Sequence, residues 1–92
     1  MANVYRLFVG ANNKTGKCEL TKLKGILDKN FQGYTVIKSQ GRWEGKDEPS
    51  VIVEISTDES QKIETLVIQI CKELGQAAVG VQVLPPIAFI AA

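Results

Sequence analysis

The chain contains no histidine and only two cysteines, so most familiar catalytic and metal-binding arrangements cannot be built from it. Hydrolases that pair a serine or cysteine nucleophile with a histidine base are excluded. Zinc sites rely mainly on histidine and cysteine ligands, and Cys18 and Cys71 alone are too few for one. We therefore expect a protein that is not an enzyme and that uses no metal and no cofactor.

An excess of charge and a long apolar run are also missing. Eleven basic residues face ten acidic ones, which leaves a net charge of +1. Surfaces that bind nucleic acid or anionic membranes are usually strongly basic, so both partners are disfavoured. No segment reaches the roughly 20 apolar residues of a membrane span. The first ten residues, MANVYRLFVG, lack the basic start and long apolar stretch of a secretory signal, and we expect a cytoplasmic protein.

The hydrophobic pattern predicts one domain over residues 1–92, with an apolar C-terminal tail at 87–92. Apolar and polar residues alternate as in strands in some segments, and recur at helical spacing in others. A strand–helix–strand unit therefore occurs twice. Right-handed crossovers then predict a ferredoxin-like β-α-β-β-α-β sandwich of the α+β class, with an antiparallel sheet in the order 4-1-3-2 and both helices on one face. The predicted strands are 4–9, 34–40, 50–55 and 79–84, and the predicted helices are 18–31 and 57–74, the second of them capped by Ser56.

Several local features carry expectations of their own. The charged segment 41–50 holds two glycines and a proline and is typical of a hairpin loop. Ser56 and Glu59 have the spacing of a capping box at the start of the second helix. Gly25 lies inside the first helix, where glycine is costly, which suggests a close approach by another segment. The strands are expected to contribute to the core Tyr5, Leu7, Val9, Val51, Val53, Ile55, Val79, Val81 and Val83.

The glycine-bearing loop 10–17 connects the first strand to the first helix. It ends in Gly-Lys, but the spacing between its glycines and the absence of a hydroxyl after Lys17 exclude a phosphate-binding P-loop. Backbone amides at a helix start, with lysines nearby, can still hold an anion. The alternative is an ordinary connection with no ligand. The candidate ligand-binding residues are Asn12, Asn13, Lys14, Thr15 and Lys17.

Arg42 and Trp43 form the second candidate site. Arginine can hold a phosphate or carboxylate through two hydrogen bonds, and the indole ring of tryptophan offers a stacking plane for a base. The alternative is that Trp43 covers one end of the core. If both candidate segments bind one small anionic, nucleotide-like ligand, we expect the site to lie between subunits.

Self-association is expected from the face of the sheet that the helices leave open. This face should carry apolar residues beside Arg6 and Glu54, which can pair across neighbouring strands. Solvent disfavours so apolar a surface, and a dimer or higher oligomer is predicted. The candidate interface residues, including those of the tail, are Phe8, Ile52, Leu84, Ile87, Phe89 and Ile90.

The two cysteines lie near one end of the predicted helical layer. Cys18 begins the first predicted helix, and Cys71 falls late in the second. Because the helices should be antiparallel, a disulfide is geometrically allowed. Two reduced thiols are the alternative that a cytoplasmic protein favours.

Three segments resemble a group of small accessory proteins of phages and prophages: VYRLFVGANNKTG, FQGYTVIKSQGRWEGKDEPSVIVEI and the late apolar strand. The Gly-x-Trp hairpin is also loosely similar to a bacterial domain of unknown function. The phage resemblance implies a protein in the host cytoplasm that blocks or sequesters a component of host defence. Two functions follow as hypotheses. One is sequestration of a small ligand, and the other is inhibition or regulation of a host protein with no small ligand.

Overall fold

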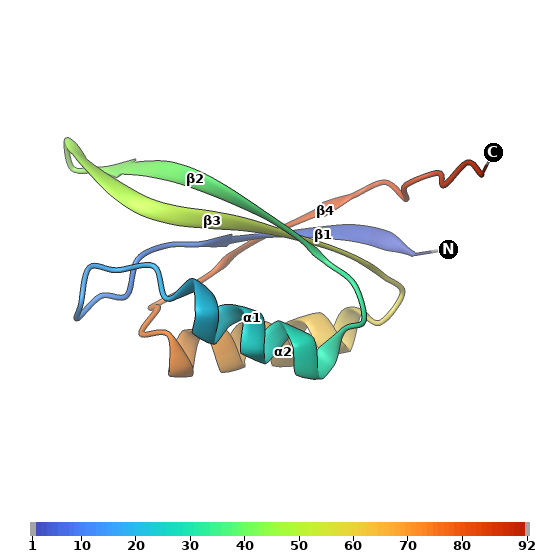
Figure 1. Ribbon diagram of the computed structural model, residues 1–92, viewed down its shortest axis with the longest axis horizontal. Coiled ribbons are helices and arrows are strands. Elements are labelled where there is room, and N and C mark those ends of the chain that lie inside the picture. Colours follow the sequence, from blue (N-terminus) through green and yellow to red (C-terminus); the bar gives the residue numbers. More distant parts are fainter. Residues whose placement is uncertain (1, 92) are drawn as a thin grey trace.

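The computed structural model describes residues 2–91 and has the predicted ferredoxin-like architecture. Four antiparallel strands lie in the order β2-β3-β1-β4, which is the predicted order read from the opposite edge. Both helices cover one face of the sheet, and the other face is open (Figure 1). The elements are β1 (Asn3–Val9), α1 (Leu20–Asn30), β2 (Thr35–Trp43), β3 (Lys46–Thr57), α2 (Ser60–Glu73) and β4 (Gly80–Leu84).

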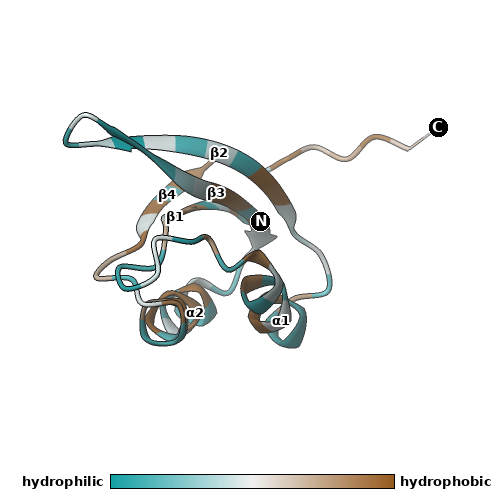
Figure 2. Ribbon diagram, turned by 60° about the vertical axis from the view of Figure 1, so that its left-hand side comes forward, coloured by the Kyte–Doolittle hydropathy of each residue, from teal (hydrophilic) through white to brown (hydrophobic). Residues whose placement is uncertain are grey.

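The core forms between the helices and the two central strands, β1 and β3. Each helix turns one apolar stripe toward the sheet, as Figure 2 shows by colour, and its charged residues face solvent. Leu7 and Val53 are opposite each other in the register and are fully buried beneath these stripes. The buried helical residues are Leu23, Ile26 and Leu27 in α1, and Ile63, Leu66 and Ile70 in α2.

The open face of the sheet carries the predicted ion pair. Arg6 and Glu54 are opposite each other on β1 and β3, and the Nε atom of Arg6 donates to Oε2 of Glu54 at 2.8 Å. Phe8 is exposed on the same face, and Ile52 and Leu84 are half-buried.

The helices found in residues 2–91 are too short and too polar to span a membrane.

The prediction of a long hairpin loop at 41–50 was wrong. β2 and β3 continue through this segment to a two-residue turn at Glu44 and Gly45, whose φ angles are 50° and 75°. Turns with two positive φ angles match the twist of paired strands, so the ribbon stays regular up to its tip. Charged residues fit these strands because the ribbon extends beyond the helical layer, where both of its faces meet solvent (Figure 1).

The predicted capping box at the start of α2 was also wrong. Ser56 belongs to β3, where it pairs with Val4, and the N-cap residue of α2 is Glu59, whose own side chain makes no capping hydrogen bond. The Thr57 hydroxyl accepts a hydrogen bond from the Glu59 amide at 3.1 Å instead. Ser56 is therefore a residue of β3 and not the N-cap of α2, as the sequence pattern had predicted.

Two valines of β4 lie outside the core to which they were assigned. The exposed fractions of Val81 and Val83 are 46% and 56%, and Val79 is only partly buried. β4 is an edge strand, and α2 does not cover its outer side.

The expectation for Gly25 in α1 was also wrong. No other segment approaches it closely, since nothing lies within 4 Å of a Cβ atom built on it.

Candidate functional site

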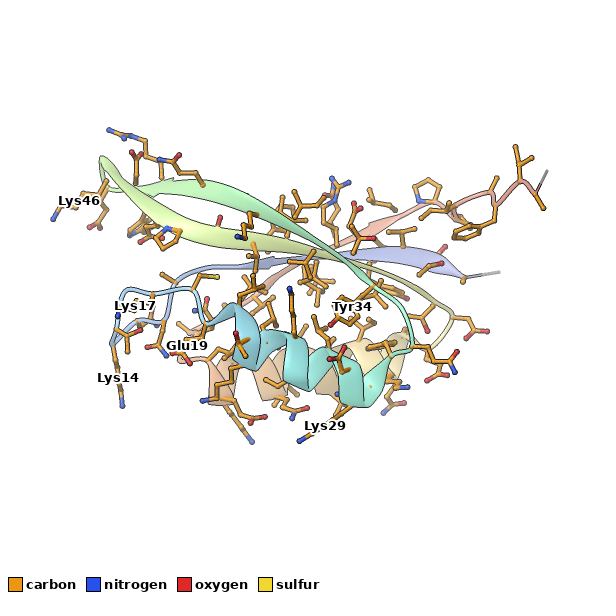
Figure 3. All side chains as sticks on the ribbon, viewed as in Figure 1. Lys14, Lys17, Glu19, Lys29, Tyr34 and Lys46 are labelled. Carbon is orange, nitrogen blue, oxygen red and sulfur yellow. The ribbon has the colours of Figure 1, made fainter. Side chains whose placement is uncertain are left out.

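Two segments that the sequence singled out project from the same end of the molecule. The β1–α1 loop and the tip of the β2–β3 hairpin both extend from the left-hand end in Figure 1. Lys14 and Lys17 on the loop and Lys46 on the hairpin point outward from this end in Figure 3. All three side chains are exposed, and none pairs with a carboxylate within residues 2–91. We call this region the lysine end.

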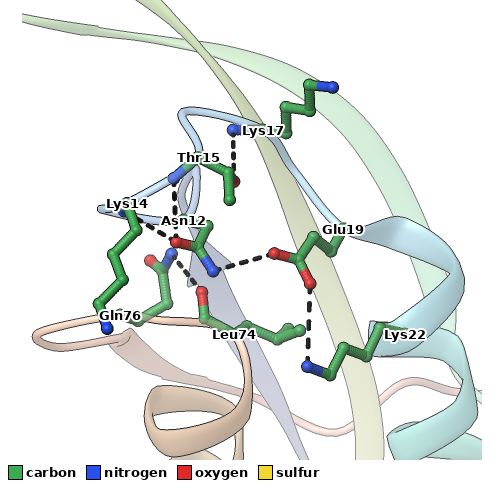
Figure 4. A network of polar contacts seen from close by, with 8 residues as sticks. All are labelled: Asn12, Lys14, Thr15, Lys17, Glu19, Lys22, Leu74 and Gln76. Atoms are coloured by element: carbon green, nitrogen blue, oxygen red, sulfur yellow. Dashed lines mark hydrogen bonds and ion pairs between the residues drawn. The ribbon is translucent and has the colours of Figure 1, made fainter.

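The β1–α1 loop is organised by the side chain of Asn12 (Figure 4). Its Oδ1 atom accepts hydrogen bonds from the backbone amides of Lys14 at 2.8 Å and Thr15 at 3.3 Å. Its Nδ2 atom donates to Oε1 of Glu19 at 2.9 Å. Asn12 and these two amides are therefore used within the loop, and Asn12 shapes the candidate site rather than offering free groups to a ligand.

Gln76 fixes the same loop from the segment that follows α2. Its Oε1 atom accepts from the Gly10 amide at 3.2 Å, and its Nε2 atom donates to the Ala11 carbonyl at 2.6 Å. The Asn13 amide donates to the Gly75 carbonyl at 3.0 Å. Sequence reasoning missed this role of Gln76. The only signal was its position directly after the helix-ending Gly75.

The start of α1 already has a negative charge beside it. Glu19 is the residue before the helix, and its carboxylate contacts Asn12 and lies 3.9 Å from Nζ of Lys22. An external anion at the start of α1 would therefore meet the like charge of the Glu19 carboxylate. Partial burial, and secondarily the charge of Glu19, raise the pKa of the Cys18 thiol. Both cysteines are free thiols.

The hairpin tip carries Arg42 and Trp43 on the last two positions of β2. Nη1 of Arg42 donates to Oδ1 of Asp47 at 2.7 Å, and Nη2 donates to the Gly45 carbonyl at 2.9 Å. The guanidinium therefore braces its own turn. Trp43 is 67% exposed and does not cover the core, so its ring faces remain open for stacking.

A separate hollow of about 690 Å³ lies at the opposite end of the molecule. Its lining includes Phe31, Tyr34, Lys62 and Phe89. Nζ of Lys62 lies 4.7 Å from the centre of the Phe31 ring and 3.7 Å from a carboxylate oxygen of Glu59. The ammonium group of Lys62 is therefore already paired with groups of the same chain. None of the candidate ligand-binding residues lies here, and residues 2–91 contain no group of three potential metal ligands.

Solved structures of other proteins share this architecture. A DUF3240 family protein from Shewanella baltica has a TM-score of 0.64 at 14% identity, over 100% of this chain and 99% of that one. The PII-like protein CPII from Thiomonas intermedia, bound to ADP, AMP and bicarbonate, has a TM-score of 0.61 at 13% identity, over 97% and 96%. Arabidopsis thaliana PII bound to citrate has a TM-score of 0.56 at 22% identity, over 91% and 78%.

These likenesses show the fold and extend over nearly the whole chain. The first of them agrees with the looser resemblance to a domain of unknown function. No protein-family model matches the chain, and neither does any curated protein sequence, so the phage-type resemblance gains no support.

Proposed function

We propose that this protein is an oligomer that binds a small anionic, nucleotide-like molecule at its lysine end and does not transform it. One observation carries the proposal. Three ammonium groups point outward from one end of the molecule (Figure 3), and the exposed Trp43 belongs to the hairpin tip at that same end (Figure 1). Ammonium groups attract phosphates, and an exposed indole stacks on a base, so this combination suits a nucleotide.

Proteins of the same fold support the choice of ligand. CPII was solved with ADP, AMP and bicarbonate, and Arabidopsis PII with citrate, and all four ligands are anionic. In a single copy of this chain, the groups of the lysine end lie on an exposed loop and ribbon and do not enclose a cavity. The ligand would therefore be enclosed only when a second subunit supplies the other wall.

We further propose that the binding serves sequestration. The chain has no histidine, and its described residues hold no potential metal cluster, so its chemistry suits retention of a molecule better than turnover. The phage-type resemblance adds a purpose, which is removal of a host-defence signal in the host cytoplasm.

Calorimetry of the full chain against a panel of linear and cyclic nucleotides tests the proposal. We expect at least one member to bind with a Kd below about 100 μM, or roughly −5.5 kcal/mol. Lys17→Ala and Trp43→Ala should each weaken that binding at least tenfold. Lys29→Ala is the matched control, because it removes the same charge from an exposed position on α1 away from the lysine end (Figure 3). If no nucleotide binds below this limit, or if the control weakens binding equally, the proposal is wrong.

The exposure of Trp43 also favours a second candidate function, inhibition or regulation of a host protein. Exposed tryptophans are frequent anchors of protein interfaces. This alternative predicts that Trp43→Ala abolishes capture of a host protein while no nucleotide binds.

A further inference from the structure

The outer edge of β4 is unprotected. β4 pairs with β1 on one side, and no other strand of residues 2–91 pairs with its second side. Its sequence, GVQVL, contains no charge and no proline. Edge strands usually carry such residues because they prevent pairing with other chains. The opposite edge strand, β2, follows this rule with Lys38 and Arg42.

An apolar groove of about 700 Å³ runs beside this edge, between β4 and α2. Val81 and Val83 form its sheet side, and Val67 and Ile68 form its helix side. Val81, Val83 and Ile68 are exposed, so these large apolar side chains remain in contact with water in a single copy. The groove and the free strand edge together form one surface that lacks a cover.

The C-terminal tail has the complementary character. Residues 85–91 continue beyond β4 and project past the sheet (Figures 1 and 2), and Ile87 and Phe89 line the open side of the hollow beside Phe31. The exposed fractions of Ile87, Phe89 and Ile90 are 50%, 82% and 94%, and the segment contains no charge. Burying this segment therefore removes no charge from water.

We propose that the tails of two copies are exchanged, each pairing with the β4 edge of the other copy and covering its groove. The tail directly follows β4, so a two-fold axis near the proline pair lets both copies make the same contact. In a symmetric antiparallel pair the residue on the axis faces itself, and residues opposite each other are then an even number of positions apart and share a face.

This symmetry determines which tail residue enters the groove. An axis at Pro85 places Phe89 opposite Val81, and an axis at Pro86 places it opposite Val83. Both valines line the groove, so the large Phe89 side chain covers it in either register. The inference does not rest on ligand binding, and it concerns a different surface from the open face that carries Phe8.

Disulfide cross-linking of the full chain tests the exchange, in a background with Cys18→Ser and Cys71→Ser. The pairs Val81→Cys with Phe89→Cys, and Val83→Cys with Phe89→Cys, cover the two registers. Within one copy the members of the two pairs are eight and six positions apart, which in an extended chain corresponds to roughly 26 and 20 Å at about 3.3 Å per residue, so a disulfide within one copy is excluded. We expect one of the two pairs to give an oxidant-dependent species of twice the 10.1 kDa chain mass.

The control pair is Ile52→Cys with Phe89→Cys, because Ile52 lies on the open face of the sheet. Circular dichroism establishes that each variant is folded. The proposal is overturned if both groove pairs stay monomeric after oxidation, or if the control pair cross-links as efficiently as they do. Independently, Phe89→Lys should raise the dimer dissociation constant at least tenfold, and an unchanged constant would also contradict the exchange.

Discussion

At the scale of single residues, three polar side chains give the lysine end its shape. The Asn12 side chain bonds to Glu19 and to a backbone amide of the loop, and the Gln76 side chain bonds to the loop's backbone from the other side. Together these contacts hold the β1–α1 loop between α1 and the end of α2. Gly75 permits this arrangement, because its φ of 61° lies where other residues are strained. Lys14 and Lys17 contribute only backbone groups to this scaffold, and their side chains extend into solvent.

Substitution by alanine should have opposite effects on the free energy of unfolding at Gly25 and at Gly75. Gly25→Ala should increase the free energy of unfolding by about 0.5–1 kcal/mol, because alanine favours the helix and nothing lies within 4 Å of the added Cβ. Gly75→Ala should decrease it, because the added Cβ would lie 2.7 Å from the Asn12 side chain and φ is positive. Urea denaturation measures both. Destabilisation by Gly25→Ala would mean that α1 packs differently at this point.

Cys18 should react slowly with alkylating reagents at neutral pH. Partial burial raises its pKa and the charge of Glu19 adds to the effect, so less of the reactive thiolate is present than in a free cysteine. Iodoacetamide kinetics in a Cys71→Ser background measure the rate. Glu19→Gln should accelerate the reaction only in part, since burial is the larger cause. A rate equal to that of a free cysteine would contradict this environment for Cys18.

At the scale of elements, the hydrophobic period predicted every helix and strand in the right order. It succeeded because apolar spacing such as that of Leu66 and Ile70 reflects burial directly. It failed where a segment has solvent on both sides. Arg42 and Asp47 belong to paired strands of an exposed ribbon, and their charges suggested a loop.

For the edge strand β4 the hydrophobic pattern failed in the opposite way, because it predicted burial for residues that are exposed. Val81 and Val83 alternate as core residues do, but the position of α2 relative to the sheet decides what is covered, and no local pattern encodes that position. For the lysine end, the sequence indicated the charged loop and the hairpin pair. It did not indicate the role of Gln76, because that contact joins residues 66 positions apart.

The stability of α2 against the sheet gives an element-scale prediction. Leu66→Ala should lower the free energy of unfolding by about 2–5 kcal/mol, because the side chain is buried between helix and sheet. Glu64→Ala on the exposed side of the same helix is the control and should change stability by less than about 0.5 kcal/mol. A denaturation midpoint unmoved by Leu66→Ala would remove this residue from the core.

At the scale of the whole molecule, the amount of exposed apolar surface predicts assembly. Phe8 on the open face, Val83 on the free edge and Phe89 on the tail are all exposed in one copy. Light scattering at micromolar concentration should therefore report a mass of at least twice 10.1 kDa. Deleting residues 87–92 should weaken the association of subunits, and it should have a smaller effect on the free energy of unfolding of each subunit. A monomer under these conditions would contradict both the oligomer and an enclosed site between subunits.

Native mass spectrometry of the protein taken directly from cells tests the central claim most directly, because it reports subunit number and retained small molecules together. We predict an oligomer that carries a small anionic, nucleotide-like mass, and we predict that Trp43→Ala leaves the oligomer intact and removes that mass. An oligomer that carries no small molecule, in a protein that also binds none of the nucleotides by calorimetry, would contradict the account.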